Sequence, residues 1–182
     1  MPWQRLIVVG TTGAGKTTLA QRAAARLGCP CVELDALFWG PGWTPAARGV
    51  FRTRVAAALA GERWAAGGNY GQARDIVWRR ADTLVWLDYP LPLVLGRLLR
   101  RTLRRILTRE VLWSGNRETW RAQFLSRESL FLWALHSHPR QRRDYPVLLA
   151  QPEYAHLQAW RLRSPAAAEL WLRALPSAPA PA

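Results

Sequence analysis

The sequence predicts a three-layer α/β/α sandwich around a parallel sheet, and two observations lead to this fold class. Five short apolar segments typical of strands alternate with helix-like segments along the 182 residues, which is the pattern of βαβ units. The first strand, residues 3–9, runs directly into a glycine-rich loop and then a helix. The length suits one domain, which we expect to span residues 1–175 before a flexible proline-rich tail, residues 176–182.

The glycine-rich loop, residues 10–17, fills the pattern G-x-x-x-x-G-K-[ST] at every fixed position. In such a loop successive backbone N–H groups point inward, and the positive end of the following helix, expected over residues 16–27 and stopped by Gly28, faces the same space. We therefore favour nucleotide binding over a structural glycine turn. The residues expected to bind ATP here are Gly10, Thr11, Thr12, Gly13, Ala14, Gly15, Lys16, Thr17 and Thr18.

Two residues of this loop have specific expected roles. Lys16 is the only lysine among the 26 Lys and Arg residues, and its compact ammonium suits the β- and γ-phosphates. The Thr17 hydroxyl is expected to hold Mg²⁺. The predicted cofactors are therefore ATP and Mg²⁺.

A carboxylate closes the second predicted strand, residues 31–35. A strand, a helix and a strand within about thirty residues form a βαβ unit with parallel strands. Asp35 should then emerge at the same edge of the sheet as the phosphate loop. It can accept the proton of an acceptor hydroxyl or hold Mg²⁺ through water, and we prefer this role to that of a turn or capping aspartate.

Residues 36–43 are rich in Gly and Pro and predict a loop, yet they contain Phe38, Trp39 and Trp43. These rings either line an acceptor pocket or fill a small satellite core, and the sequence leaves both interpretations open.

A helix is expected to follow, with Thr44 as its N-cap and Pro45 as its first residue. It should run through residue 60 and end at Gly61. Its inward face repeats every four residues, at Phe51, Val55 and Leu59.

The third strand, residues 62–66, leads into a second glycine-rich turn, residues 67–71, expected near the first. Arg74, on the short helix after it, either reaches an anionic acceptor or is a plain surface arginine. The fourth strand, residues 83–88, ends at Asp88, which has the loose shape of a Walker B carboxylate, although a turn role is the stronger interpretation.

The helix expected over residues 91–107 has an apolar side and a basic side. Arginines this dense repel one another unless anions lie nearby, so we favour contact with phosphate or nucleic acid over a merely solvated face. The basic side consists of Arg97, Arg100, Arg101, Arg104 and Arg105.

Residues 108–117 interrupt the helical pattern and suggest a short mobile flap. A helix should resume over residues 118–136, and another basic helical segment should start at Arg140 and run to residue 149. His136 and His138 are expected at the surface, since no third metal ligand is evident. The apolar positions of the resumed helix include Trp120, Phe124, Leu125 and Phe131.

The fifth strand is expected over residues 156–162, and Ser164 and Pro165 should cap a last helix through residue 175. A membrane-spanning helix needs about 18 consecutive apolar residues, and no stretch of this sequence approaches that length. We therefore expect a cytoplasmic protein without a membrane partner. Cys29 and Cys31 are too few and too close together for a disulfide framework or a four-ligand zinc site, and we expect both to be reduced.

The net charge of +14 has two explanations. Basic surface binds nucleic-acid backbones, and a cleft for two polyphosphates also needs many arginines.

The chain resembles the adenylate-kinase-like branch of the P-loop kinases, and more closely the bacterial proteins described as DNA topology modulation proteins or adenylate-kinase-related kinases. The resemblance covers nearly the whole chain up to the proline tail. The segments that carry it are L-D-A-L-F-W at 34–39, P-G-W at 41–43, G-N-Y at 68–70, L-D-Y-P at 87–90, L-W at 112–113 and G-N-R-E at 115–118.

This resemblance implies a five-stranded parallel sheet in the order 2-3-1-4-5, an acceptor-binding insert over about residues 36–61 and a lid over about residues 108–117. In similar kinases lid arginines neutralise the transferring phosphoryl group, and adenine lies between a lid-side arginine and the loop after the fifth strand. Here these roles would fall to Arg105 or Arg109, to Arg117, and to the turn at Ser164 and Pro165.

The expected function is transfer of the γ-phosphoryl group of ATP to a nucleotide or another small-molecule acceptor. The sequence favours an acceptor that is itself phosphorylated. The expected catalytic residues are Lys16, Asp35, Arg109 and Arg117, and Mg²⁺ is expected at Thr17 and Asp35. The expected acceptor site consists of Asp35, Phe38, Trp39, Asn69, Tyr70 and Arg74.

One position departs from the resemblance, because related chains often carry Asp where this one has Gly67. If that Asp helps to hold Mg²⁺, this chain relies on Thr17 and Asp35 or is a weaker enzyme. The alternative functions are a nucleic-acid-associated ATPase and a nucleotide-binding regulator of DNA topology without phosphoryl transfer; nucleic acid is the less favoured partner.

Overall fold

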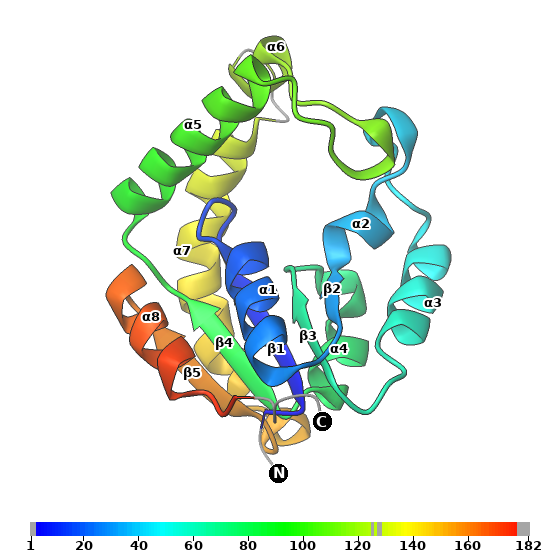
Figure 1. The fold of residues 1–182 in the computed structure, drawn as a ribbon, viewed down its shortest axis with the longest axis vertical. Helices are drawn as coiled ribbons and strands as arrows, with labels where there is room; N and C mark the ends of the chain where they lie inside the picture. The colour runs from blue at the N-terminus through cyan, green and yellow to red at the C-terminus, as the bar shows by residue number, and fades with distance from the viewer. Residues whose placement is uncertain (1–2, 125, 127–128, 178–182) are drawn as a thin grey trace.

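The computed structural model describes residues 3–124, 126 and 129–177. Its centre is one sheet of five parallel strands in the order β2-β3-β1-β4-β5, which confirms the predicted fold class (Figure 1). The strands are β1 (Arg5–Gly10), β2 (Cys31–Glu33), β3 (Trp64–Gly67), β4 (Thr83–Leu87) and β5 (Gln158–Leu162).

Helices cover both faces of this sheet, and β1 shows why. Leu6 and Val8 pack in a core shared with the helices α1 (Lys16–Leu27) and α8 (Pro165–Ala174). Ile7 and Val9 point to the opposite face, because side chains alternate along a strand. The core on that face is built with α3 (Arg48–Ala58), α4 (Arg74–Arg80) and α7 (Leu130–Leu149).

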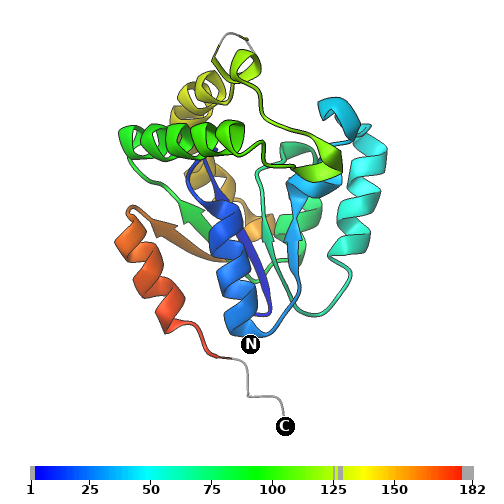
Figure 2. The same cartoon turned by 45° about the horizontal axis from the view of Figure 1, so that its top comes forward.

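The helix α5 (Leu91–Leu107) lies across the carboxyl edge of the sheet, above the loop that joins β1 to α1 (Figure 2). Its buried side chains are Val94, Leu98 and Thr102. The bounds of α5 and α1 are those predicted from the sequence. Gly28 ends α1 in the left-handed conformation, at φ 62°, which glycine adopts without steric cost.

The segment after β2 differs from the prediction. The second strand stops at Glu33, and a short helix, α2 (Leu34–Phe38), carries Asp35 in its first turn where a strand end and a loop were expected. The one-turn segment η1 (Pro41–Trp43) follows. The reason is that apolar residues at both ends of this run pack inward, with Leu34 buried and Phe38 against the α3 core.

The prediction that Thr44 and Pro45 open the next helix is also wrong. Thr44 donates its hydroxyl to the Pro41 carbonyl at 2.9 Å, and Pro45 pairs with Trp39 in an isolated β-bridge. Both residues therefore close a turn back onto η1. The helix α3 begins at Arg48 and ends at Ala58, before Gly61, although its predicted inward residues Phe51, Val55 and Leu59 are all fully buried.

The chain between α5 and β5 contains two helices, divided differently from the prediction. The short helix α6 (Trp120–Phe124) replaces the start of the expected long one, and α7 runs unbroken from Leu130 to Leu149 through Pro139. Leu125 lies outside the described residues. Ser129 starts α7 by accepting a hydrogen bond from the Phe131 amide at 3.2 Å, a capping signal that the sequence reading missed.

The two histidines of α7 have different environments. His136 is exposed, as predicted, but the prediction for His138 is wrong: it is 7% exposed, and its Nε2 lies 2.8 Å from the Tyr89 carbonyl oxygen. Near the C-terminus, Ser164 caps α8 by accepting from the Ala167 amide at 3.1 Å, as predicted.

The remaining one-turn segments are η2 (Gly71–Ala73), η3 (Trp113–Gly115) and η4 (Pro152–Tyr154). Within the described ranges, no helix has both the length and the apolar character needed to cross a bilayer.

Candidate active site

The phosphate loop joins β1 to α1 at the carboxyl edge of the sheet. Its glycines have positive φ angles, with Gly10 at 146°, Gly13 at 83° and Gly15 at 99°. A side chain at Gly13 would place Cβ 2.9 Å from both the Val94 carbonyl oxygen and Leu98 Cβ. Glycine is therefore required at this position both by the backbone angle and by the close approach of α5.

Lys16 extends from the start of α1 into the loop and donates to the Thr11 carbonyl at 3.2 Å. Burial lowers its pKa from 10.5 to about 8, with a further lowering from the charge of Arg101 and an opposing effect from Asp35. A half-buried ammonium without a closely paired anion is poorly satisfied, so this site favours an added negative charge.

Asn69 fastens the loop to the neighbouring strand. Its Oδ1 accepts from the Gly10 amide at 3.1 Å, and its Nδ2 donates to the Gly10 carbonyl. Because both ends of the amide bind the first residue of the phosphate loop, Asn69 is better suited to positioning that loop than to the acceptor contact expected from the sequence.

Asp35, in the first turn of α2, faces Tyr70 from the turn after β3. The Tyr70 hydroxyl donates to Asp35 Oδ1. Burial raises the pKa of Tyr70 above its ordinary value, and the charge of Asp35 raises it further, so the phenol stays a hydrogen-bond donor. Tyr70 thereby orients the carboxylate and leaves its second oxygen for another partner.

The sequence left open whether the aromatic residues 38, 39 and 43 fill a small core or line an acceptor pocket, and in the structure they do not all have the same role. Phe38 packs against Tyr70 and Phe51, with ring centroids 4.6 and 5.1 Å away, and is part of the core. Trp39 stacks edge-on with Trp43, and Trp43 with Trp113, at 5.6 and 6.5 Å. Phe38 therefore fills a core, whereas the tryptophans form a contact with the lid.

The segment predicted to form a lid, residues 108–117, contacts the segment predicted to bind the acceptor. Asn116, which is 5% exposed, accepts from the Trp43 amide at 3.0 Å and donates to the Gly40 carbonyl at 2.8 Å. Ser114 donates to the Trp39 carbonyl at 2.8 Å, and the Trp113 indole donates to Glu33 at 3.1 Å. These contacts hold the end of the lid to the insert in this conformation.

Of the arginines on α5, Arg97, Arg101 and Arg105 are spaced four residues apart and so share one side of the helix. A guanidinium nitrogen of Arg97 lies 3.6 Å from the position a Gly15 Cβ would occupy, and its guanidinium carbon is 5.7 Å from the centroid of the Tyr89 ring. Burial, followed by the charge of Arg105, lowers the pKa of Arg101. The sequence reading counted both among the basic residues but did not select them for the site.

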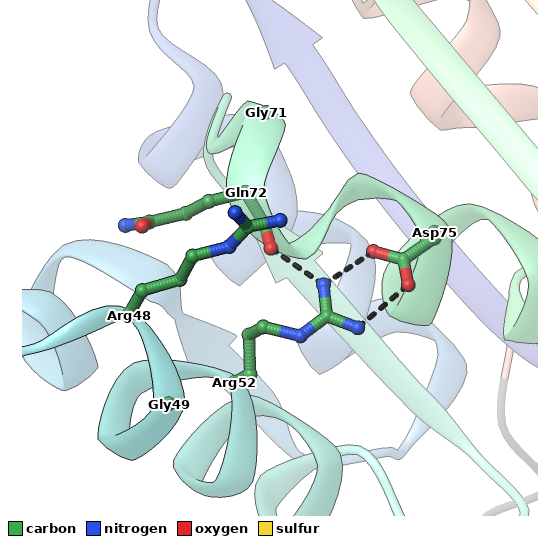
Figure 3. Close-up of a pocket in the computed structure, with 6 residues that line it drawn as sticks. All are labelled: Arg48, Gly49, Arg52, Gly71, Gln72 and Asp75. Atoms are coloured by element: carbon green, nitrogen blue, oxygen red, sulfur yellow. Dashed lines mark hydrogen bonds and ion pairs between the residues drawn. The ribbon is translucent and has the colours of Figure 1, made fainter.

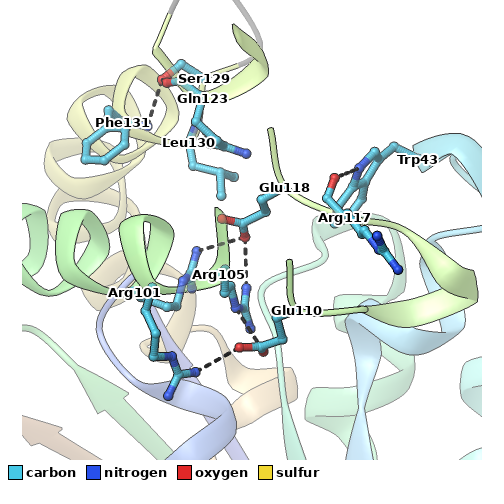
Figure 4. A network of polar contacts seen from close by, with 11 residues as sticks. Trp43, Arg101, Arg105, Glu110, Arg117, Glu118, Gln123, Ser129, Leu130 and Phe131 are labelled. Carbon is cyan, nitrogen blue, oxygen red and sulfur yellow. Dashed lines mark hydrogen bonds and ion pairs between the residues drawn. The ribbon is translucent and has the colours of Figure 1, made fainter. Parts of the chain in front are cut away.

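The arginines selected from the sequence lie elsewhere. Arg105 is held by Glu118 at 2.9 Å and by Glu110 at 3.3 Å (Figure 4). Arg109 is exposed at φ 51°, just past the end of α5. Arg117 is exposed as well, and its carbonyl accepts from the Trp43 indole at 3.2 Å. The i, i+4 spacing could have grouped Arg97 and Arg101 with Arg105, but it does not show which of the three faces the phosphate loop.

Four other candidate residues have contacts or roles of their own in the fold. Asp88 binds Arg142 at 2.6 Å and Arg161 at 2.7 Å, so both carboxylate oxygens are paired, and the less favoured metal role loses support. The guanidinium carbon of Arg74 lies 5.3 Å from the centroid of the Trp78 ring. Ser164 caps α8, and Pro165 is its first residue.

Magnesium is implied by the phosphate-loop sequence, and the donor set is consistent with it. The Thr17 hydroxyl has no hydrogen-bond partner among the described residues, and Asp35 keeps one oxygen unengaged by Tyr70. Mg²⁺ in such sites takes one or two protein ligands and completes its shell with phosphate oxygens and water, so Thr17 and Asp35 can hold it. In the described part of the chain, no cluster of three His, Cys, Asp or Glu side chains could hold a metal by itself.

A pocket of about 480 Å³ opens beside the turn that carries Tyr70 (Figure 3). Arg52 is neutralised there by Asp75 at 2.7 Å and also binds the Gln72 carbonyl at 2.7 Å. Arg48 points into the same pocket and has no ion-pair partner among the described residues. The pocket therefore has an unbalanced positive charge. Its lining is Arg48, Gly49, Arg52, Gly71, Gln72 and Asp75.

Comparison with known proteins identifies the fold but no family. No family model matches the chain, and no curated protein matches it. Among solved structures, a gluconokinase from Sinorhizobium meliloti 1021 matches with 16% identity and a TM-score of 0.53, over 95% of this chain and 94% of that one. A shikimate kinase from Acinetobacter baumannii in complex with shikimate matches with 20% identity and a TM-score of 0.49, over 93% and 89%. The chain has the fold of the P-loop kinases; the narrower resemblance to DNA topology modulation proteins has no support from these comparisons.

Proposed function

We propose that the protein is a P-loop kinase that transfers the γ-phosphoryl group of ATP to a small, anionic acceptor. One observation carries the proposal: α5 crosses directly over the phosphate loop, with Gly13 against Val94 and Leu98. Lys16 lies in that loop, and the charges of Asp35 and of Arg101 on α5 both act on its pKa. A cation for the phosphates, a carboxylate for the acceptor and a cation for the transferring group thus meet in one site. These are the parts that in-line phosphoryl transfer requires.

Each group has a defined task in this proposal. The N–H groups of the phosphate loop and Lys16 bind the triphosphate, with Asn69 fixing the start of the loop. Thr17 and Asp35 would hold Mg²⁺, which would neutralise charge at the phosphates when bound. Asp35, oriented by Tyr70, directs the acceptor hydroxyl and takes its proton. Arg97 and Arg101 neutralise the negative charge that builds up on the transferring group.

The pocket at Arg48 and Arg52 supports an anionic acceptor. The pocket borders Gly71 and Gln72, which follow directly after Tyr70, so it lies on the acceptor side of the site. Arg52 is already neutralised by Asp75, and the free charge is that of Arg48. A carboxylate or phosphate on the acceptor would pair with Arg48 through charge-assisted hydrogen bonds.

The test is a screen of nucleoside monophosphates, phosphorylated sugars and hydroxy acids with ATP and Mg²⁺, read as ADP release above a control without acceptor. We expect at least one anionic acceptor to stimulate release, and Lys16→Ala to abolish it while the protein stays folded. Release that no compound stimulates, or that persists unchanged in Lys16→Ala, contradicts the proposal.

A nucleic-acid-associated ATPase is the second candidate, because the lid and α6 carry exposed arginines without a side-chain partner among the described residues. These include Arg109, Arg117 and Arg121. A protein that neutralises several backbone phosphates loses about a thousandfold in affinity between low and moderate salt. Duplex binding with that salt dependence, and ATP hydrolysis stimulated by the duplex, would favour this candidate over the kinase.

A further inference from the structure

Glu118 is a buried carboxylate between two exposed residues. Only 2% of its side chain is accessible, while its neighbours Arg117 and Thr119 are exposed. Carboxylates are almost never buried to this extent unless they are paired, because removing an isolated charge from water is costly. The position therefore depends on the partners of Glu118.

Those partners are two arginines of α5. Glu118 Oε1 lies 2.9 Å from an Arg105 Nη and 3.9 Å from an Arg101 Nη (Figure 4). The two guanidinium groups are one helical turn apart, a spacing at which like charges repel. The carboxylate contacts both and so offsets their repulsion.

The two arginines are not equally neutralised. Arg105 has a second carboxylate, Glu110, at 3.3 Å, whereas Arg101 has only the longer contact with Glu118. The Nε atom of Arg101 is buried without a hydrogen-bond partner among the described residues, as is Oε2 of Glu118. The positive charge of Arg101 is therefore less completely offset than that of Arg105. The charge of Arg101 also lowers the pKa of Lys16 in the phosphate loop.

Glu118 is also linked to the acceptor side through the chain itself. Asn116, two residues earlier, is buried and binds the backbone at Gly40 and Trp43 of the insert. Burial alternates along this extended stretch, with Asn116 and Glu118 inward and Arg117 outward. Residues 116–118 therefore connect the acceptor insert to the arginines above the phosphate loop.

We propose that Glu118 is a positioning residue, which holds the guanidinium of Arg101 where charge develops on the transferring phosphoryl group. It does so by separating Arg101 from Arg105, and Asn116 fixes its place relative to the acceptor insert. This inference rests on the proposed kinase function. It assigns Glu118 no contact with substrate, so its loss should weaken binding of the transition state and leave ground-state nucleotide binding nearly unchanged.

The experiment compares the affinity of the full-length protein for MgADP with its affinity for MgADP plus aluminium fluoride, a mimic of the transferring phosphoryl group. The variants are Glu118→Gln, which keeps the shape and removes the charge, and Glu118→Asp, which keeps the charge and shortens the reach. For both we expect the MgADP dissociation constant to stay within about threefold and the affinity for the fluoride complex to fall by about tenfold or more. Glu153→Gln, which breaks an exposed ion pair with Arg79 at 2.8 Å, is the matched control and should change neither.

A double-mutant cycle with Arg101→Gln separates positioning from a merely structural role. If Glu118 acts through Arg101, adding Glu118→Gln to Arg101→Gln produces little further loss. Additive losses overturn the inference, and so does an unchanged affinity for the fluoride complex in both Glu118 variants. This holds even if the variants have lower melting temperatures than the wild type, because a loss of stability alone would indicate a structural role. Because the readout is binding, it stays separate from the acceptor screen: a wild-type protein that transfers phosphate to no acceptor refutes the proposed function without deciding the cycle.

Discussion

Replacing Lys16 with methionine should make the ligand-free protein more stable while it destroys nucleotide binding. Lysine and methionine have similar length and similar helix propensity, so the substitution mainly removes the charge. Burial has lowered the pKa of Lys16 from 10.5 to about 8. The folded protein therefore holds this ammonium less favourably than the unfolded chain does.

The size of the effect follows from that pKa. Each tenfold change in proton affinity corresponds to about 1.4 kcal/mol, so the charged Lys16 costs about 3 kcal/mol of folding free energy at pH 7. Methionine also loses the hydrogen bond to the Thr11 carbonyl, worth about 1 kcal/mol. The net gain is about 2 kcal/mol, or about 4–8 °C in melting temperature for a chain of this length.

The pH dependence of stability tests separately whether the charge of Lys16 destabilises the folded protein. Between pH 8 and 10.5 the unfolded chain binds more protons at Lys16 than the folded protein does, so the stability of the wild type rises with pH across this window. The advantage of Lys16→Met should therefore be largest at pH 7 and disappear by about pH 10.5. Arg173→Met, an exposed cation on α8, controls for the general effect of removing a positive charge.

The assay is thermal unfolding of wild type, Lys16→Met and Arg173→Met at a series of pH values, without nucleotide. A Lys16→Met protein that is no more stable than the wild type at pH 7 would refute the reasoning. So would an advantage that persists unchanged at pH 10.5.

Three further predictions concern the loop, the carboxylate and α5. Gly13→Ala should lower the free energy of unfolding in urea by about 2–4 kcal/mol. The added Cβ would lie 2.9 Å from atoms of α5, and residue 13 has a positive φ angle that alanine rarely adopts. A loss below about 0.5 kcal/mol would contradict this prediction. Asp35→Asn should lower phosphoryl transfer by about 100-fold or more, because it removes the base and weakens one ligand proposed for Mg²⁺. ATP affinity should change far less, since the phosphate loop and Lys16 still bind the triphosphate, and full activity would move both roles elsewhere. Arg101→Gln should lower transfer at least about tenfold at saturating ATP, against no change for the remote Arg173→Gln, and equal rates would remove Arg101 from the site.

The parts of the fold with strong local signals could be predicted from the sequence. The phosphate-loop pattern and the apolar period of α5 gave both helices with the correct bounds. The strand order came from a resemblance carried by short segments spread along the chain, and the sheet has that order. The bounds of the two helices depend on neighbouring residues, and a sequence pattern displays them directly.

The errors fall where tertiary contacts decide the local structure. The sequence 44–45 has a good helix-start signal, but Pro45 is used in a bridge to Trp39, and the helix starts three residues later. The sequence predicted one helical segment ending at residue 136 and another starting at Arg140, yet α7 is continuous from Leu130 to Leu149, with Ala134, His138 and Tyr145 buried along it. Neither competing contact is visible in the local sequence.

The candidate site shows the same division. Lys16 and Asp35 follow from motif and topology, whereas the choice among the five arginines of α5 depends on the angle at which the helix crosses the phosphate loop. The charge of Arg101 lowers the pKa of Lys16 in the loop, whereas Arg105 is bound by Glu118 and Glu110. Which arginine faces the phosphates is thus set by packing at Gly13 and by two carboxylates distant from any motif.

The central claim is that the phosphate loop, Asp35 and α5 together transfer the γ-phosphoryl group of ATP. The most direct measurement follows ATP labelled in its γ-phosphate, incubated with Mg²⁺ and the anionic acceptors of the screen, and identifies where the label ends. The claim predicts label on an organic acceptor with the wild type and none with Lys16→Ala. Label found only in inorganic phosphate, at a rate that no acceptor alters, would contradict it.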